Sequence, residues 1–277
     1  MLHFEVIGRP GHPPGGAPGG PPAGAHPGRL VLVHGFTQTG RSWGPVLERL
    51  AADRQVLAVD APGHGRSGHY QVGLWEAARL LGEVGNEAAY LGYSMGGRLV
   101  LHLALAAPYL VRRAVLVSTT AGIDDEHRRT ARRAADEVLA AGLESDGVDA
   151  FLRRWLADPL FETLPAEAAG LEARRENTAE GLAAALRLLG TGSQEPLWDR
   201  LGSLAMPALL VAGERDERFV DLAARLAAGW GGPARVAVVP GAGHAVHLEQ
   251  PDAFAEVVLP FLAGDHPSAT PAASSTP

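Results

Sequence analysis

The 277-residue sequence contains no cysteine and no lysine. The absence of cysteine excludes disulfides, thiolate metal sites and a cysteine nucleophile, and it leaves the redox compartment undetermined. The absence of lysine excludes Schiff-base chemistry and a phosphate-loop lysine. Every fixed side-chain cation is therefore an arginine, so recognition of an anionic ligand by charge falls to that residue type.

The sequence also lacks a basic surface charge and a long apolar run. Its formal net charge is −7, so neither nucleic acid nor an anionic membrane surface is expected as a partner. The first ten residues, MLHFEVIGRP, lack a basic start followed by an apolar core, and no apolar run reaches membrane-spanning length. We therefore expect a cytoplasmic protein without a membrane partner. The sequence does not indicate its oligomeric state.

Hydrophobic residues make up 46% of the chain, whose length suits one α/β domain with an insertion better than two independent units. Short apolar runs alternate with helical patterns and predict a mainly parallel sheet covered on both faces. The expected buried strands are 30–33, 55–59, 88–91, 114–118, 208–212 and 235–239, with an edge strand at 2–7. The expected helices of this core are 42–52, 74–81, 95–106 and 252–263.

The alternation stops between residues 123 and 201. A helical insertion after a strand whose carboxyl end faces a site is typical of a cap over that site. We therefore expect an α/β core at 1–122 and 202–263, and a helical cap at 123–201. Within the cap, helical patterns occur at 124–141, 148–157, 167–176 and 179–189.

Two segments are too poor in large apolar side chains to contribute to a core. Segment 8–28 is mostly Gly, Pro, Ala and His, and we expect a mobile surface loop; a ligand for a proline-recognition domain is the alternative. Segment 264–277, rich in Ser, Thr, Ala and Pro, is expected to be a disordered tail.

A serine at a tight turn carries the first chemical prediction. The apolar run at 88–91 is followed by Gly92-Tyr93-Ser94-Met95-Gly96-Gly97 and then by a helical pattern. A serine on such an elbow is exposed at the carboxyl end of the sheet, and glycines two residues before and after it avoid collisions of Cβ atoms. Ser94 is therefore the predicted catalytic serine. An incidental serine in a Gly-rich turn is the alternative.

A serine hydroxyl reacts at neutral pH only when a histidine takes its proton and a carboxylate orients that histidine. Loops after the last two expected strands supply Asp216 and His244, and the order Ser94, Asp216, His244 is the one found in a serine triad on an α/β sheet. Glu214 competes with Asp216, and His247 competes with His244. We prefer Asp216 because it lies deeper in its loop, and His244 because flanking glycines allow a sharp turn.

Negative charge that develops on a substrate oxygen needs preorganised donors. At such an elbow one donor is the main-chain N–H of the residue after the serine, and the other comes from the loop after the strand that ends in His-Gly. These donors are Met95 and Phe36, and only their main chain matters for that role.

The chain carries six short motifs: HGF with Trp43 nine residues after the histidine, DAPGHGRS, GYSMGGR, GTGSQEPLW, GERDERF and GAGHAVHLEQP. Over residues 29–263 the sequence resembles the α/β-hydrolase superfamily, and together these motifs are similar to the menaquinone-pathway 2-succinyl-6-hydroxy-2,4-cyclohexadiene-1-carboxylate synthase family. Gln38 stands where that family tends to have glycine, and the long Gly/Pro insertion between Ile7 and Arg29 is a second departure from the family pattern.

The resemblance implies a lyase on an α/β-hydrolase frame, without metal or cofactor, that eliminates pyruvate from a succinyl-enolpyruvyl-hydroxycyclohexene carboxylate. A small substrate with several carboxylates needs cations that converge locally, and the planar fork of arginine suits carboxylates. The positions that match the family's substrate-binding residues are Tyr93, Arg98, Arg132, Trp155 and Arg175.

A solvated helix face is the alternative for any one arginine of the cap. Arg132 and Asp136 have the spacing of an ordinary i,i+4 ion pair, which stabilises a helix by only a few tenths of a kcal/mol, roughly. We assign four further arginines to the surface: Arg128, Arg129, Arg133 and Arg174.

In the implied reaction, Ser94 is activated by His244 and abstracts a ring proton, while Asp216 orients the imidazole. The N–H groups of Met95 and Phe36 stabilise the charge as enolpyruvate leaves. Two alternatives use the same frame. One is a serine carboxylesterase or carbon–carbon bond hydrolase with a nucleophilic serine, and the other is a ligand receptor that catalyses nothing.

Overall fold

The computed structural model describes residues 1–8 and 28–264. The predicted mobile loop at 8–28 and the predicted tail at 264–277 lie outside the described residues, apart from their terminal glycines.

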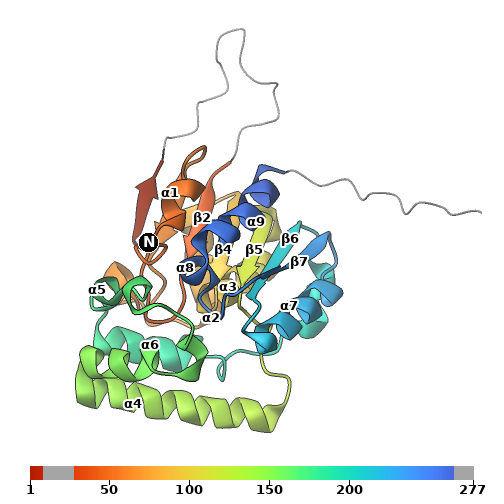
Figure 1. The fold of residues 1–277 in the computed structure, drawn as a ribbon. Helices are drawn as coiled ribbons and strands as arrows, with labels where there is room; N and C mark the ends of the chain where they lie inside the picture. Colours follow the sequence, from red (N-terminus) through yellow and green to blue (C-terminus); the bar gives the residue numbers. More distant parts are fainter. Residues whose placement is uncertain (9–27, 265–277) are drawn as a thin grey trace, which may run out of the picture.

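A single mixed sheet forms the centre of the described part of the chain (Figure 1). The strand order is β1-β3-β2-β4-β5-β6-β7; β1 runs antiparallel to β3, and all other neighbours run parallel. The predicted, mainly parallel sheet is confirmed. In chain order the strands are β1 (Phe4–Ile7), β2 (Leu30–Val33), β3 (Val56–Val59), β4 (Ala88–Tyr93), β5 (Val111–Val117), β6 (Ala208–Gly213) and β7 (Ala234–Val239).

Side chains alternate along each strand, so the sheet has two apolar faces, and helices cover both of them. In β2, Val31 and Val33 join one apolar cluster, whereas Leu30 and Leu32 join the other. The first cluster includes side chains of α2 (Leu74–Gly85), α3 (Met95–Ala106) and α7 (Glu217–Gly229). The second includes side chains of α1 (Val46–Leu50), α8 (Val246–Glu249) and α9 (Pro251–Ala263).

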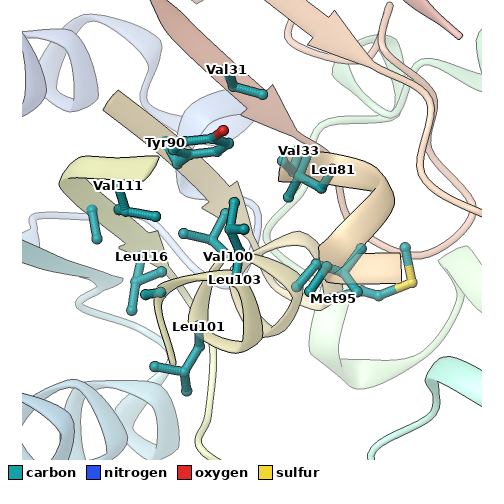
Figure 2. Packing of buried hydrophobic residues seen from close by; sticks show 14 of the residues in the cluster. Val31, Val33, Leu81, Tyr90, Met95, Val100, Leu101, Leu103, Val111 and Leu116 are labelled. Atoms are coloured by element: carbon teal, nitrogen blue, oxygen red, sulfur yellow. The ribbon is translucent and has the colours of Figure 1, made fainter. Parts of the chain in front are cut away.

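The first turns of α3 are packed into the centre of the first cluster. Figure 2 shows the α3 side chains Val100 and Leu103 gathered near the strand residues Tyr90 and Leu116. Every residue of α3 from its start to Ala104 is buried. This burial fixes the beginning of α3, and with it the turn that precedes the helix, relative to the sheet.

A second group of helices lies at one end of the sheet, away from the helices that cover its faces (Figure 1). It consists of α4 (Glu126–Leu156), α5 (Leu171–Arg174) and α6 (Ala179–Leu189). Leu143, Phe151 and Leu182 belong to the small apolar cluster that joins α4 to α6. We call these helices and the chain between them the cap helices.

Glycines decide where two of the cap helices are interrupted. Gly147 has φ +78°, so α4 contains a break between two helical pieces, which agrees with the patterns at 124–141 and 148–157. The helix predicted at 167–176 is wrong in its extent. Gly170 has φ +64°, a left-handed conformation that separates a short 3-10 turn from α5 and leaves α5 only four residues long. None of the described helices is both long and apolar enough to cross a membrane.

Candidate active site

Ser94 lies at the sharp turn between β4 and α3. Its φ of +51° and ψ of −108° form a backbone conformation that non-glycine residues rarely adopt. A Cβ atom at Gly92 would lie 2.4 Å from the Gly96 carbonyl oxygen, and one at Gly96 would lie 2.0 Å from the Val33 carbonyl oxygen. Thr119 Oγ1 also donates a hydrogen bond to the Ser94 carbonyl oxygen at 2.8 Å. The turn therefore requires both glycines and holds the serine in one position.

Three loops that follow three different strands place a hydroxyl, an imidazole and a carboxylate in hydrogen-bonding sequence. His244 Nε2 lies 3.1 Å from Ser94 Oγ, and His244 Nδ1 lies 2.7 Å from Asp216 Oδ2. The side chains of His244 and Asp216 are only 2% and 10% exposed. In this geometry the carboxylate fixes the tautomer of the imidazole, and the imidazole can accept the proton of the serine.

The two competing residues have other places in the structure. Glu214 accepts a hydrogen bond from the Gly241 N–H at 2.8 Å and so holds the loop after β7. The ring of His247 packs against Trp43, with 4.8 Å between ring centroids, and against Tyr93, with 4.6 Å. Burial lowers the pKa of His247 to about 3. His247 is therefore a neutral core residue at neutral pH.

The N–H groups of Phe36 and Met95 stand at the two main-chain positions predicted for an oxyanion hole. Met95 is the first residue of α3, so its N–H has no acceptor within the helix. The Gly35–Phe36 peptide is held by Gln38, whose N–H donates to the Gly35 carbonyl oxygen at 3.2 Å. Gln38 Oε1 in turn accepts from the Gly35 N–H at 3.0 Å. The residue that departs from the family pattern therefore shapes this loop.

A cavity of about 430 Å³ opens at Ser94 and His244 between the sheet and the cap helices. Asp216 and Arg175 are the two predicted site residues that do not line it. Among the described residues, no group of three or more His, Asp or Glu side chains could hold a metal ion. The predicted residues in the cavity wall are Phe36, Tyr93, Ser94, Met95, Arg98, Arg132, Trp155 and His244.

Arg98 lies one helical turn after the serine and is 7% exposed. Its Nη1 donates to the Leu189 carbonyl oxygen and to Gln194 Oε1, the latter at 3.5 Å. Burial lowers the pKa of Arg98 to about 10, so the guanidinium remains a cation at neutral pH. Because both of these acceptors are uncharged, they do not neutralise its charge.

Arg132 forms the i,i+4 contact that its spacing predicts, but the contact is not a solvated surface pair. Its Nε donates to Asp136 Oδ1 at 2.7 Å, and the Asp136 side chain is only 2% exposed. Arg132 itself is 39% exposed and lines the cavity. The buried carboxylate therefore holds Nε and leaves the two Nη groups for other acceptors.

The predicted placement of two adjacent cap arginines is wrong. Arg175, predicted to bind substrate, is exposed and donates to Asp149 Oδ1 at 2.8 Å and to Glu172 Oε1 at 2.6 Å, outside the cavity. Arg174, predicted to lie on the surface, is 2% exposed and lines the cavity. Consecutive residues of a helix point in different directions. At the end of the one-turn helix α5, Arg174 therefore faces the cavity and Arg175 faces solvent.

The two hydrogen bonds that hold the guanidinium of Arg174 both go to uncharged oxygens. Nε donates to the Ala169 carbonyl oxygen at 2.7 Å, and Nη1 donates to Thr37 Oγ1. Burial lowers the pKa of Arg174 to about 10, and the group stays charged at neutral pH. The cavity therefore contains a second buried cation whose charge these contacts leave uncompensated.

Two aromatic residues predicted at the site form part of its wall. The Trp155 ring lies with its centroid 5.1 Å from that of Phe36 and 5.8 Å from that of Phe161. Its buried Nε1 has no hydrogen-bond partner among the described residues. Tyr93 is 3% exposed, and its ring centroid lies 5.5 Å from that of His244.

Several residues of the cavity wall besides Arg174 were not predicted from the sequence, and five of them come from elements next to the triad. Three of them follow β5, and their position was foreseeable because the carboxyl ends of parallel strands meet at one edge of a sheet. Two others come from α7, a helix that was not predicted; it enters the site because it begins directly after Asp216. These five residues are Ser118, Thr119, Thr120, Arg218 and Phe219.

A mainly parallel sheet that carries a serine elbow, followed in the chain by an acid and a histidine on later loops, is typical of one class of enzymes. The chain belongs to the alpha/beta hydrolase family, whose model matches residues 30–257, and it is an enzyme of that fold. The fold class predicted from the sequence is confirmed.

Within that class, the chain is similar to proteins with one particular name. The putative 2-succinyl-6-hydroxy-2,4-cyclohexadiene-1-carboxylate synthase of Bacillus subtilis (strain 168) is 34% identical over 247 residues, which cover 84% of this chain and 89% of that protein. The synthase of the same name from Photorhabdus laumondii is 31% identical over 242 residues, which cover 84% of each chain. The predicted resemblance to this synthase family is confirmed.

Solved structures agree with this placement. The structure of MenH from S. aureus has a TM-score of 0.83 and 28% identity, and the match covers 96% of this chain and 99% of that chain. The enol-lactonase from Burkholderia xenovorans LB400 has a TM-score of 0.71 and 23% identity, and the match covers 94% of this chain and 96% of that chain. The likeness to the enol-lactonase shows a common fold and nothing more.

Proposed function

We propose that this chain is a lyase that eliminates pyruvate from a succinyl-enolpyruvyl-hydroxycyclohexene carboxylate in menaquinone biosynthesis. The observation that carries the proposal is that Arg98, Arg132 and Arg174 line the same cavity as Ser94. They concentrate positive charge in a protein whose formal net charge is −7. A substrate with several carboxylates fits such a site, because a guanidinium forms strong, charge-assisted hydrogen bonds with a carboxylate.

In this proposal the serine and histidine act together as a general base. Ser94 Oγ accepts the proton from the ring carbon while its own proton passes to His244 Nε2, so the net transfer is from carbon to imidazole. Asp216 holds the other ring nitrogen and stabilises the imidazolium that forms. The reaction needs no acyl-enzyme.

The electron pair left on the ring forms the new double bond as the C–O bond to the enolpyruvyl group breaks. The N–H groups of Phe36 and Met95 stabilise the negative charge that develops on oxygen. His244 returns the proton to the leaving group, and the enolpyruvate tautomerises to pyruvate. The arginines hold the substrate carboxylates in place during these steps.

A serine carboxylesterase or carbon–carbon bond hydrolase is the second candidate, because the 3.1 Å separation between His244 Nε2 and Ser94 Oγ also suits nucleophilic attack. That reaction needs a water molecule for the second step and makes no use of three arginines in the cavity wall. We therefore rank it behind the lyase.

Pyruvate release is the direct test of the proposed function. Purified protein is supplied with the succinyl-enolpyruvyl-hydroxycyclohexene carboxylate, and pyruvate is followed through the oxidation of NADH by lactate dehydrogenase. We expect turnover by the wild-type protein and a loss of at least about a thousandfold in Ser94→Ala, because the general base then lacks its relay group. Circular dichroism of Ser94→Ala checks that the variant is folded.

Three outcomes separate the candidates. Pyruvate release that depends on Ser94 supports the lyase. Rapid turnover of p-nitrophenyl esters without pyruvate release would assign the chain to the hydrolases. Absence of both activities, together with tight binding of the substrate, would indicate a receptor that has kept the triad without using it.

A further inference from the structure

Thr37 directly follows the predicted oxyanion donor Phe36 and has an unusual backbone. Its φ is +67°, in the left-handed region that a β-branched residue rarely occupies. Such a conformation persists only where the surroundings hold it. Thr37 is completely buried, and its N–H, its carbonyl oxygen and its hydroxyl are each engaged by a different group.

The core holds the N–H of Thr37 through a histidine. This N–H donates to His64 Nε2 at 3.2 Å. His64 Nδ1 donates to the Pro62 carbonyl oxygen at 2.9 Å, which leaves Nε2 as the acceptor. Burial lowers the pKa of His64 to about 3, so the imidazole stays neutral and keeps this lone pair at neutral pH.

The cap helices hold the other two polar groups of Thr37. Asn177 Nδ2 donates to the Thr37 carbonyl oxygen at 2.7 Å, and Arg174 Nη1 donates to Thr37 Oγ1. Asn177 Nδ2 also donates to the Arg174 carbonyl oxygen at 2.8 Å, and Asn177 Oδ1 accepts from the Gly65 N–H at 2.8 Å. Arg174 and Asn177 are 2% and 5% exposed, so water does not compete for these bonds.

We propose that Thr37 is a positioning residue that couples the carboxylate-binding guanidinium of Arg174 to the oxyanion N–H of Phe36. The inference rests on the proposed function, since it assigns Arg174 a carboxylate of the substrate. The contacts with Ala169 and Thr37 occupy Nε and Nη1 and leave Nη2 for the ligand. A bound carboxylate therefore keeps the guanidinium in the position in which it also holds Thr37.

The consequence is a link between recognition and chemistry within one loop. The peptide before Phe36 is held by Gln38, and the peptide after it is held through Thr37. Loss of the Thr37 hydroxyl leaves the Arg174 guanidinium held only through Nε by the Ala169 carbonyl oxygen, and it loosens one side of the oxyanion donor. Both substrate affinity and the rate of the chemical step then fall, whereas a residue that served packing alone would affect stability first.

A pair of substitutions at Thr37 separates the hydroxyl from the rest of the side chain. Thr37→Val keeps the branched shape and removes only the acceptor, while Thr37→Ser keeps the acceptor and removes a methyl group. Because a hydrogen bond from a charged donor is lost, we expect Thr37→Val to lower kcat/KM by roughly tenfold or more, with KM raised and kcat lowered. Thr37→Ser should remain close to wild type. Equal losses in both variants, accompanied by equal falls in Tm, would show that Thr37 only fills space.

A double-mutant cycle tests the path through Arg174. If Thr37 acts on recognition through that guanidinium, Thr37→Val should raise KM little further in an Arg174→Gln background. Fully additive effects of the two substitutions on KM would overturn the coupling.

Binding of succinate keeps the inference testable without turnover. By calorimetry, we expect succinate to bind wild-type protein and Thr37→Ser alike and to bind Thr37→Val about tenfold more weakly. If the three proteins show these relative affinities but the wild type releases no pyruvate, the proposed function fails and the Thr37–Arg174 link stands. Equal affinity in all three proteins, or no binding by wild type, would refute the link itself.

Discussion

Arg174 and Arg175 are chemically identical neighbours with opposite surroundings. The first is buried in the cavity wall and binds uncharged oxygens, and the second pairs on the surface with Asp149 and Glu172. Exposed ion pairs of this kind contribute roughly 0–1 kcal/mol to stability. A buried guanidinium that faces a cavity can instead form a strong charge-assisted hydrogen bond with a ligand carboxylate.

The two arginines therefore form a matched pair of substitutions. We expect Arg174→Gln to raise KM for the polycarboxylate substrate by roughly tenfold or more, because a charge-assisted contact with the ligand is lost. Arg175→Gln should leave KM and kcat near their wild-type values. Steady-state kinetics of pyruvate release measure both. A larger effect at Arg175 than at Arg174 would return the substrate role to the residue that the sequence alone favoured.

In the strand-turn-helix element at Ser94, backbone atoms pack so closely that there is no room for a side chain at the neighbouring glycines. The packing of β4, α3 and β2 leaves no room for a Cβ atom at Gly96, because the Val33 carbonyl oxygen lies in its place. That oxygen belongs to a central strand and cannot move without disturbing the sheet.

At the scale of this element, we expect Gly96→Ala to abolish pyruvate release and to lower the free energy of unfolding by about 1–3 kcal/mol or more, the usual cost of overpacking. Gly202→Ala is the control, since a Cβ atom there would meet no atom within 4 Å. Its effect on stability should be within about 0.5 kcal/mol. Urea unfolding monitored by circular dichroism gives both values. Unchanged stability and activity in Gly96→Ala would contradict the reported geometry of the elbow.

At the scale of the whole molecule, burial lowers the pKa of four histidines among the described residues, so that they are neutral at neutral pH. Burial lowers the pKa of His34 and His102 to about 4 and that of His64 and His247 to about 3. In the unfolded chain a histidine titrates near 6.5, roughly. The unfolded state therefore binds more protons than the native state between these values, and stability must fall as the pH falls below about 6.5.

We accordingly expect acid-sensitive folding that begins well above the range in which most carboxylates titrate. Each histidine contributes up to about 1.4 kcal/mol of lost stability per pH unit, in the window between its unfolded and native pKa values. Urea unfolding at a series of pH values from 7 to 5 measures the slope. His247→Phe, which keeps an aromatic ring between Trp43 and Tyr93, should reduce proton uptake on unfolding by about one. A free energy of unfolding that is independent of pH over this range would rule out the buried neutral histidines.

Much of the fold and part of the candidate site were accessible from the sequence because their signals are local. Each central strand is a short apolar run, so its position is encoded where it lies, and the serine elbow is marked by the glycines that its own turn requires. The loops with Asp216 and His244 follow two such strands. Because these strands run parallel, their carboxyl ends bring both loops to the same edge of the sheet.

Tertiary structure alone decided which of the two adjacent cap arginines faces the cavity. Whether Arg174 or Arg175 points inward depends on where a one-turn helix ends and on what packs beneath it, and neither is visible in a run of two arginines. The coupling at Thr37 likewise joins residues 137 and 140 positions apart in the chain. Such contacts are absent from local sequence patterns because they arise only when the cap helices and the sheet close around the same buried space.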